Sequence, residues 1–410
     1  MSTDVATVSL ADLDSVEVRR DPYPWYARMH DHGPVAMVAK PSRFDFVISG
    51  FAAANQLLRD PTIRVVDVTR MATTPTWEEH PTQSIFMNSV VFTNNERHMK
   101  MRKMFTTVFT PRRVAALEPA VSRIVSDRLE RMARIAAAGE PVEFMSEFCY
   151  PVPSDVLGEL LGVPEADRAW YRPLAATLGV VLELGGSTTE NTRIADEASR
   201  QLLAYFDKLC DARRDDPRDD LVTALAQAMD EGTSRVSPEE LLANLVVLFN
   251  AGFVTTTHLI GNGLTLLLDH PEAMAALRAD PKLAPAYIEE MLRLEGPIHF
   301  MIRWSSADTE VAGVSIPAGS RILVLLAAGN RDPARFPDPD TFNPGRTDNQ
   351  ILSFGLGAHF CLGAALARLE GDRAFNMLLD RFPTITLDRP PGTPGQLMLR
   401  GHDQLWLRLG

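Results

Sequence analysis

Apolar residues recur at helical spacing over most of the chain, and the longest such run covers residues 241–268. Within it, Leu245-Val246-Val247-Leu248-Phe249 is apolar on every face, which predicts a helix buried on all sides. Residues 21–29, 51–58 and most of 114–229 also follow a helical period. Turn signals interrupt the last of these regions at Gly139-Glu140-Pro141, Gly162-Val163-Pro164, Gly185-Gly186 and residues 215–220.

Short apolar runs predict strands at residues 35–38, 44–48 and 322–326, the first two paired as a hairpin. Residues 71–95 are polar and irregular, which predicts a long loop. Residues 396–409 alternate enough to predict a terminal hairpin. We therefore expect a mainly α-helical fold with small β-sheets.

The middle of the long apolar run contains residues that a buried helix does not need. A glycine such as Gly252 costs about 1 kcal/mol relative to alanine inside a helix. The hydroxyls of Thr255, Thr256 and Thr257 can bond back to helix carbonyls and bend the helix. A function at this point would compensate for that cost, and core packing is the alternative.

The composition narrows the possible partners and compartment. A net charge of −12 and the lack of a basic tract argue against a surface for nucleic acid or anionic membranes. The N-terminal residues lack the cationic start and apolar core of a signal peptide, and we expect no segment to reach the roughly 20 apolar residues of a membrane span. Three unclustered cysteines are typical of a reducing compartment. We expect a soluble, cytoplasmic protein.

One glycine-rich stretch, Phe354-Gly355-Leu356-Gly357-Ala358-His359-Phe360-Cys361-Leu362-Gly363, precedes a helix predicted from Leu362 onward. Its glycines permit positive φ, and a helix N-terminus favours a thiolate at Cys361. A dinucleotide loop is excluded because Phe360 stands where a glycine is needed, and the widely separated cysteines exclude a zinc cluster. A cysteine alone is more often a small buried apolar residue.

The whole run, Phe-Gly-x-Gly-x-His-x-Cys-x-Gly, resembles the haem-binding signature of the cytochrome P450 family, soluble bacterial type. The resemblance implies one domain over residues 1–410, with haem b held between the long central helix and the helix after the cysteine loop. Cys361 would be the iron ligand. Glu290-Met291-Leu292-Arg293 resembles the family's Glu-x-x-Arg, with Arg346 as the partner that locks the haem-binding core.

The resemblance also implies further site residues. Cofactor contacts would come from His98, Arg102, Arg303, Phe354, His359 and Gly363. His98 and Arg102 are spaced i and i+4, so both can reach one haem propionate, although a solvated basic helix face has the same spacing. Oxygen chemistry would involve Ala251, Gly252 and Thr255. Substrate contacts would come from Phe86, Met87, Asn88, Val91, Val254, Pro297, Ile298, His299 and Met398, with ordinary packing as the alternative for each.

The function implied by the resemblance is a monomeric haem-thiolate monooxygenase that oxidises a small apolar or aromatic substrate in secondary metabolism. Electrons would come from a ferredoxin or flavodoxin and its reductase, steered by the basic residues Arg102, Lys103, Arg112 and Arg113. Val254 stands where the family usually has an acid for proton delivery. An atypical reaction is therefore the alternative: aromatic nitration, oxidative coupling or heteroatom bond formation. A third possibility is a non-catalytic scaffold.

Overall fold

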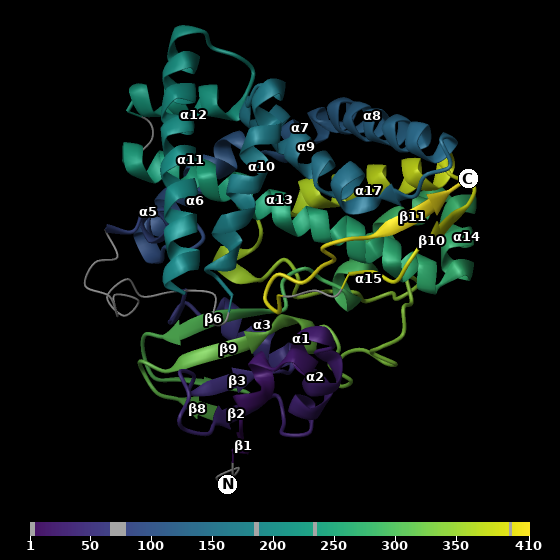
Figure 1. Cartoon of the computed structure of the whole chain (residues 1–410). Coiled ribbons are helices and arrows are strands. Elements are labelled where there is room, and N and C mark those ends of the chain that lie inside the picture. Colours follow the sequence, from purple (N-terminus) through teal and green to yellow (C-terminus); the bar gives the residue numbers. More distant parts are fainter. Residues whose placement is uncertain (1–4, 66–78, 184–187, 233–235, 393–395) are drawn as a thin grey trace. The chain divides into compact units, whose positions relative to one another are not determined.

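The computed structural model describes residues 5–65, 79–183, 188–232, 236–392 and 396–410 (Figure 1). The chain forms two compact units. Unit 1 comprises Met1–Asp67, His258–Cys361 and Pro391–Asp403, and unit 2 comprises Val68–Thr257, Leu362–Pro390 and Gln404–Gly410. The assignment of residues 1–410 to one domain stays a prediction.

Unit 1 contains most of the β-structure. Its strands are β1 (Thr7–Val8), β2 (Val35–Val38), β3 (Phe46–Ile48), β4 (Ile63–Arg64), β6 (Phe300–Ser305), β7 (Thr309–Val311), β8 (Val314–Ile316) and β9 (Arg321–Leu325). Six form one sheet in the order β1-β2-β3-β9-β6-β4, and β7 pairs with β8. The antiparallel pairing of β2 with β3 confirms the predicted hairpin.

The helices of unit 1 are short. They are α1 (Val16–Arg20), α2 (Tyr23–His30), α3 (Phe51–Arg59), α14 (Pro271–Ala279), α15 (Ala284–Leu294) and α16 (Leu326–Gly329), with 3₁₀ turns at Ala11–Asp14, Pro281–Leu283 and Gly357–His359. Leu57 of α3 is fully buried in one apolar core together with Ile48 and Val324 of the sheet.

Unit 2 is mainly helical. Its helices are α5 (Pro81–Met87), α6 (Asn95–Val108), α7 (Pro111–Ala116), α8 (Glu118–Ala137), α9 (Pro151–Leu161), α10 (Glu165–Val180), α11 (Thr189–Asp215), α12 (Leu221–Asp230), α13 (Pro238–Asp269) and α17 (Ala364–Arg381), with a π-helical turn at Met145–Cys149. A small sheet has the order β10 (Ile385–Leu387), β11 (Trp406–Leu409), β5 (Val142–Glu143). These bounds confirm the predicted turns at Gly139 and Gly162, whereas Gly185-Gly186 lies outside the described residues.

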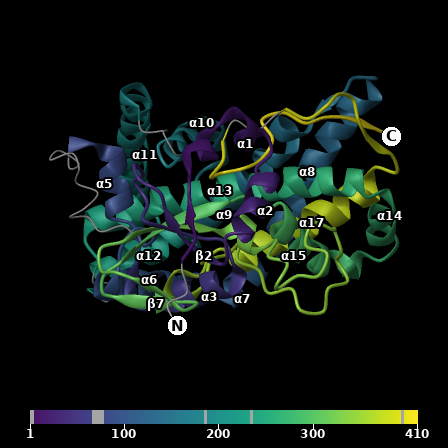
Figure 2. The ribbon, with the colours of Figure 1, turned by 90° about the horizontal axis from the view of Figure 1, so that it is seen from below.

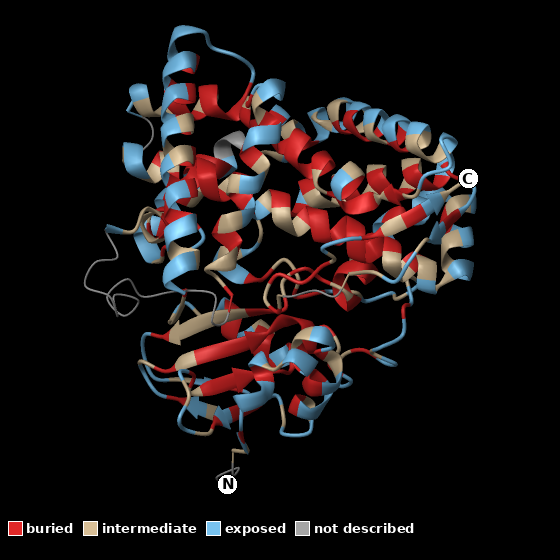
Figure 3. Cartoon of the chain, viewed as in Figure 1, coloured by how far each residue is buried: buried red, intermediate tan, exposed pale blue. Residues whose placement is uncertain are grey.

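Helix α13 confirms the predicted central helix and runs without a break, passing from unit 2 into unit 1 after Thr257 (Figures 1 and 2). Most of its residues are buried (Figure 3). It is the one helix in the described part of the chain that is long and apolar enough to cross a membrane, and 72% of the relevant window is buried. The expectation that no segment reaches this length was therefore wrong, and the burial is that of a core helix.

Two sequence predictions were wrong. Within the predicted loop at residues 71–95, Pro81–Met87 forms α5, while residues 71–78 lie outside the described part. Asp196 from α11 accepts a hydrogen bond from the Thr82 amide at 3.0 Å, so the cap of this helix comes from a distant residue that local sequence cannot reveal. The C-terminal segment forms no internal hairpin, because β11 pairs with β10 and β5 while Leu399 bridges to Ile298.

A buried carboxyl group in unit 2 predicts how stability depends on pH. Glu370 of α17 is 1% exposed, and burial raises the pKa of its carboxyl to about 8. Because this folded-state pKa lies above the ordinary value of 4.5, its stabilising contribution is complete at low pH and is lost as the pH rises through about 8. We expect Glu370→Gln to remove this loss.

The measurement is unfolding of Glu370→Gln and the parent protein between pH 5 and pH 9, with the exposed Glu165→Gln of α10 as baseline. Between the ordinary pKa of 4.5 and the folded-state pKa of about 8, the free energy of unfolding of Glu370→Gln should rise relative to that of the parent by about 1.4 kcal/mol per pH unit. A difference that stays constant with pH would contradict a protonated Glu370 in the folded state.

Candidate active site

The loop that ends at Cys361 is a tight, hydrogen-bonded turn in unit 1. The Cys361 amide donates to the Phe354 carbonyl at 2.9 Å, and the Phe360 amide donates to the Gly357 carbonyl at 3.1 Å. The rings of Phe354 and Phe360 lie 6.3 Å apart, centre to centre. Cys361 itself is half-buried, so its sulfur sits in a fixed backbone frame without being sealed from a ligand.

Glycine is required in this loop for two reasons. Gly355 and Gly357 have φ values of 64° and 68°, which side chains rarely adopt. A Cβ at Gly357 would also collide with the backbone carbonyl of Leu58 at the end of α3. The following helix, α17, begins at Ala364 rather than Leu362, because Gly363 occupies its cap position. Cys361 therefore lies just before the first turn.

The other two cysteines are poor candidates for a thiolate ligand. Cys149 is fully buried, and burial raises the pKa of its thiol well above the ordinary value. Burial likewise raises the pKa of Cys210 to about 11. Both therefore remain neutral thiols at neutral pH, which leaves Cys361 as the cysteine whose surroundings suit a metal-bound thiolate.

Two predicted cofactor contacts, His98 and Arg102, lie one turn apart on α6 in unit 2. His98 is 3% exposed, and its Nδ1 lies 2.9 Å from the carbonyl oxygen of Val90. Because a carbonyl can only accept, Nδ1 carries a proton, and this bond fixes the orientation of the imidazole.

Arg303 on β6 is a half-buried cation. Its Nη1 donates to the Ile302 carbonyl at 2.9 Å, and burial lowers the pKa of its guanidinium to about 10. Among the described residues no carboxylate forms an ion pair with it. A guanidinium that no described carboxylate pairs with suits an anionic group supplied by a ligand, such as a haem propionate.

One face of α13 remains accessible in the middle of this otherwise buried helix. Ala251 is exposed, whereas Gly252, Val254 and Thr255 keep part of their surface, and the spacing of these four residues places them on the same side. The Thr255 hydroxyl donates to the Ala251 carbonyl at 2.7 Å, which confirms the predicted back-bonding. The face offers one hydroxyl among apolar groups.

Packing explains the glycine in this helix. A Cβ at Gly252 would lie 3.0 Å from Cδ2 of Leu157 in α9, which is tighter than ordinary van der Waals contact. Glycine therefore allows α9 and α13 to pack closely at this point.

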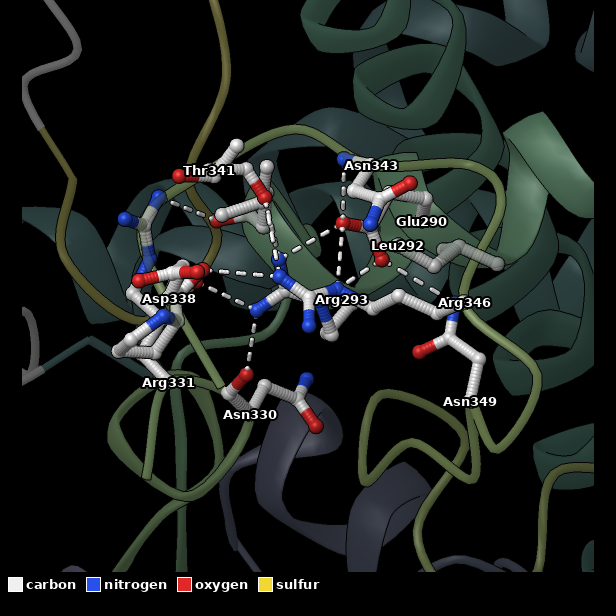
Figure 4. Close-up of polar contacts among 12 residues, drawn as sticks. Glu290, Leu292, Arg293, Asn330, Arg331, Asp338, Thr341, Asn343, Arg346 and Asn349 are labelled. Atoms are coloured by element: carbon white, nitrogen blue, oxygen red, sulfur yellow. Dashed lines mark hydrogen bonds and ion pairs between the residues drawn. The ribbon is translucent and has the colours of Figure 1, made fainter. Parts of the chain in front are cut away.

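The structure brings Glu290, Arg293 and Arg346 together in unit 1 (Figure 4). Glu290 and Arg293 are both 0% exposed, and their side chains form two hydrogen bonds of 2.8 Å. Arg346 donates to Glu290 Oε1 at 3.1 Å. The Asn343 amide and the Asn349 side chain also donate to this carboxylate, and neither residue carries a pattern that predicts this contact.

Several of the predicted substrate contacts are buried in this structure. Phe86, Met87 and Pro297 are buried, and His299 is fully buried. The His299 imidazole pairs through Nδ1 with the Tyr26 hydroxyl at 3.0 Å, and burial followed by the charge of Arg400 holds the pKa of His299 well below its ordinary value.

The remaining predicted contacts keep accessible surface. The Asn88 side chain donates a hydrogen bond to the Ser84 hydroxyl and accepts one from Arg97, so both of its polar groups already have partners in the protein. Val91 is 42% exposed, and Val254, Ile298 and Met398 are partly exposed. In unit 1 the Ile298–Leu399 bridge places Met398 beside this part of the chain, because the His299 amide donates to the Met398 carbonyl.

The family is shown by comparison with known proteins. The family model "Cytochrome P450" matches residues 184–400. The monooxygenase PikC of Streptomyces venezuelae is 38% identical over 91% of this chain and 86% of its own. The chain belongs to the cytochrome P450 family. The 6-deoxyerythronolide B hydroxylase of Saccharopolyspora erythraea is 32% identical over 98% of this chain and 99% of its own.

The fold agrees with that membership. The solved structure of CxnD, a P450 described as acting in C–S bond formation in chuangxinmycin biosynthesis, matches with a TM-score of 0.82 and 31% identity, covering 100% of this chain and 98% of that chain. The protein is thus a cytochrome P450 monooxygenase, and proteins of this family bind haem b through a cysteine thiolate. The half-buried Cys361 fits that group, and so does the Arg303 guanidinium, which forms no ion pair with a described residue.

The buried ion network predicts a large stability effect. Glu290→Gln removes the charge that neutralises Arg293, and breaking one side of a buried pair costs roughly 3–5 kcal/mol. We expect a strongly lowered melting temperature and little haem-loaded protein. Urea unfolding and haem content measure both, with the exposed Glu272→Gln of α14 as the matched control. A melting temperature equal to that of the control would contradict this structural role.

A second prediction concerns the choice of cysteine. In Cys361→Ser a neutral hydroxyl replaces the sulfur, so the carbon monoxide complex of the reduced protein should lose the absorption maximum for which the family is named. Cys149→Ala and Cys210→Ala should keep it. A normal spectrum in Cys361→Ser, or its loss in one of the controls with full haem content, would refute the assignment.

Proposed function

We propose that this monooxygenase oxidises a small apolar or aromatic organic substrate in secondary metabolism. The observation that carries the proposal is the character of the accessible candidate contacts: Val91, Val254, Ile298 and Met398 are apolar. The polar Asn88 side chain is already hydrogen-bonded to Ser84 and Arg97. The hydroxyl of Thr255 is the polar exception on the open face of α13. Apolar contacts with few polar groups are typical of sites for apolar ligands.

The residues around the cofactor have separate roles in this proposal. Cys361 ligates the iron, and the loop hydrogen bond from its amide to the Phe354 carbonyl holds the sulfur in place. Arg303, His98, Arg102 and His359 bind the propionates, while Phe354 and Gly363 shape the loop around the thiolate. When bound, haem b with a thiolate ligand supplies dioxygen activation and oxygen insertion into a C–H or C=C bond.

Electrons come from a ferredoxin or flavodoxin and its reductase. Arg102, Lys103, Arg112 and Arg113 lie on the consecutive helices α6 and α7 of a chain whose net charge is −12. A local basic cluster on an acidic protein steers an acidic partner by electrostatic attraction. The monomeric state and the cytoplasmic location stay predictions.

The substrate proposal is tested by titrating haem-loaded protein with pairs of ligands that share a shape and differ in polarity. We expect apolar and aromatic compounds to shift the haem absorption band, and their charged analogues to bind at least tenfold more weakly. Ile298→Asp and Val91→Asp should weaken the apolar ligands, whereas His299→Asn should leave affinity unchanged if the protein folds. Preferential binding of charged compounds would overturn the proposed substrate class.

A second candidate function follows from Val254. An alkyl group can neither donate nor relay a proton, so a reaction that needs less proton delivery remains an alternative: aromatic nitration, oxidative coupling or heteroatom bond formation. CxnD, described as forming a C–S bond, supports the last of these, whereas the hydroxylase relative supports ordinary oxygenation.

Coupling measurements separate the two reactions once a substrate is found. For ordinary oxygenation we expect Thr255→Ala to divert more NADPH to hydrogen peroxide, and Val254→Glu to change the division between product and peroxide, because each alters proton supply. Val254→Leu and Thr255→Ser are the conservative controls. Under the alternative, Val254→Glu should bring no improvement. Equal product per NADPH in all variants would mean that this helix face does not control proton delivery.

A further inference from the structure

The turn that presents Val91 is held from two sides by buried side chains of unit 2. Asn244 of α13 accepts a hydrogen bond from the Val90 amide at 2.8 Å. His98 of α6 binds the Val90 carbonyl at 2.9 Å. Both polar groups of one backbone residue are therefore satisfied by side chains of two different helices, and the next residue, Val91, is an apolar residue that remains 42% exposed.

Asn244 makes more contacts than one hydrogen bond to this turn. It is 0% exposed, and its Nδ2 donates to the Asn88 carbonyl at 3.1 Å and to the Glu240 carbonyl at 2.7 Å. It thus spans the backbone on both sides of Ser89 while remaining anchored in its own helix. An amide that supplies an acceptor and two donors at fixed points sets backbone geometry better than apolar packing does.

The upstream end of the same segment is held differently. Asp196 of α11 binds the Thr82 amide and His80, and the Thr82 hydroxyl lies 2.8 Å from that of Ser199. The His80 side chain is 35% exposed. This contact caps α5, whereas Asn244 acts beside Val91 itself.

We infer that Asn244 is a positioning residue that determines which ligands fit, because it fixes the Val90–Val91 turn and so the place of the Val91 side chain. The inference rests on the proposed function, in which Val91 contacts the substrate. Loss of the Asn244 bonds lowers the fraction of molecules with the turn in its binding geometry, and apparent affinity falls with that fraction. Iron coordination at Cys361 does not depend on this turn.

The probe is phenylimidazole, with imidazole as reference. Both bind the haem iron through nitrogen, but only the phenyl group reaches Val91 in the proposed site. The ratio of their dissociation constants therefore reports the contact with Val91. In Asn244→Leu we expect the preference for phenylimidazole to fall roughly threefold to tenfold, the loss expected for one hydrogen bond to the turn. Imidazole affinity and the carbon monoxide spectrum should stay unchanged.

The matched control is Asn250→Leu. Asn250 is also a buried asparagine of α13, but its amide donates to the Ala175 carbonyl of α10. Both variants lose a buried hydrogen bond and should unfold at a lower temperature. Only Asn244→Leu should change the ratio of the dissociation constants of phenylimidazole and imidazole. Asn244→Asp keeps the acceptor for the Val90 amide and should restore part of the ratio, which a general loss of stability would not do.

Hydrogen exchange reports the turn without any ligand. In Asn244→Leu the peptide covering residues 88–93 should exchange faster, while residues 81–84 should not; Asp196→Ala should give the reverse pattern. If Asn244→Leu and Asn250→Leu show the same ligand ratio and the same exchange, the positioning role is overturned. If Val91→Ala and Val91→Phe leave the ratio unchanged, the proposed contact itself is wrong and the inference falls with it.

Discussion

The buried pairing of the Glu290 carboxylate with the Arg293 guanidinium is the interaction on which the cysteine loop depends. Arg293 donates to the backbone carbonyls of Asn330, Pro339 and Thr341, so one side chain of α15 fixes three points of the segment that leads to the loop (Figure 4). The charge is tolerated at zero exposure because each N–H has an acceptor and Glu290 has five donors from four residues.

A series of hydrogen bonds connects the Glu290–Arg293 pair to Cys361. The carbonyl of Asn330 accepts a hydrogen bond from Arg293. The Asn330 side chain accepts a hydrogen bond from the Leu352 amide at 2.7 Å and donates one to the Ser353 hydroxyl at 2.8 Å. Gly355 and Cys361 then continue the turn through their bonds to the carbonyls of Leu352 and Phe354. The place of the sulfur is thus set by a chain of polar contacts that begins at α15, rather than by the loop sequence alone.

Local periodicity predicted the elements that are defined by their own residues, and this is why the central helix and the hairpin were found. The Glu290–Arg293 pair was found through its resemblance to the family's Glu-x-x-Arg. Local periodicity failed where a partner comes from elsewhere in the chain. Helix α5 has no side-chain cap of its own, and its Thr82 amide donates a hydrogen bond to Asp196 of α11 instead. Helix α3 also has a distant cap, since the Phe51 amide donates to Asp332 at 2.8 Å, but its own apolar period was enough to predict it. Asn244 was missed for the same reason, because a single asparagine in an apolar helix has no periodic signal.

The accessible face of α13 shows how a single hydroxyl is constrained by its helix. A hydroxyl has one proton, and Thr255 donates that proton to the Ala251 carbonyl, so in this state its oxygen can act toward a ligand only as an acceptor. To donate, the side chain must first break the back-bond, and Val254 provides no neighbouring acid that could replace it. In the proposed function, a proton at this face would therefore come from water, from the substrate, or from Thr255 after this hydrogen bond breaks. Asn244, which binds the Val90 amide, and Thr255 both lie on α13, so the proposed ligand contact and the proposed proton route share one supporting helix.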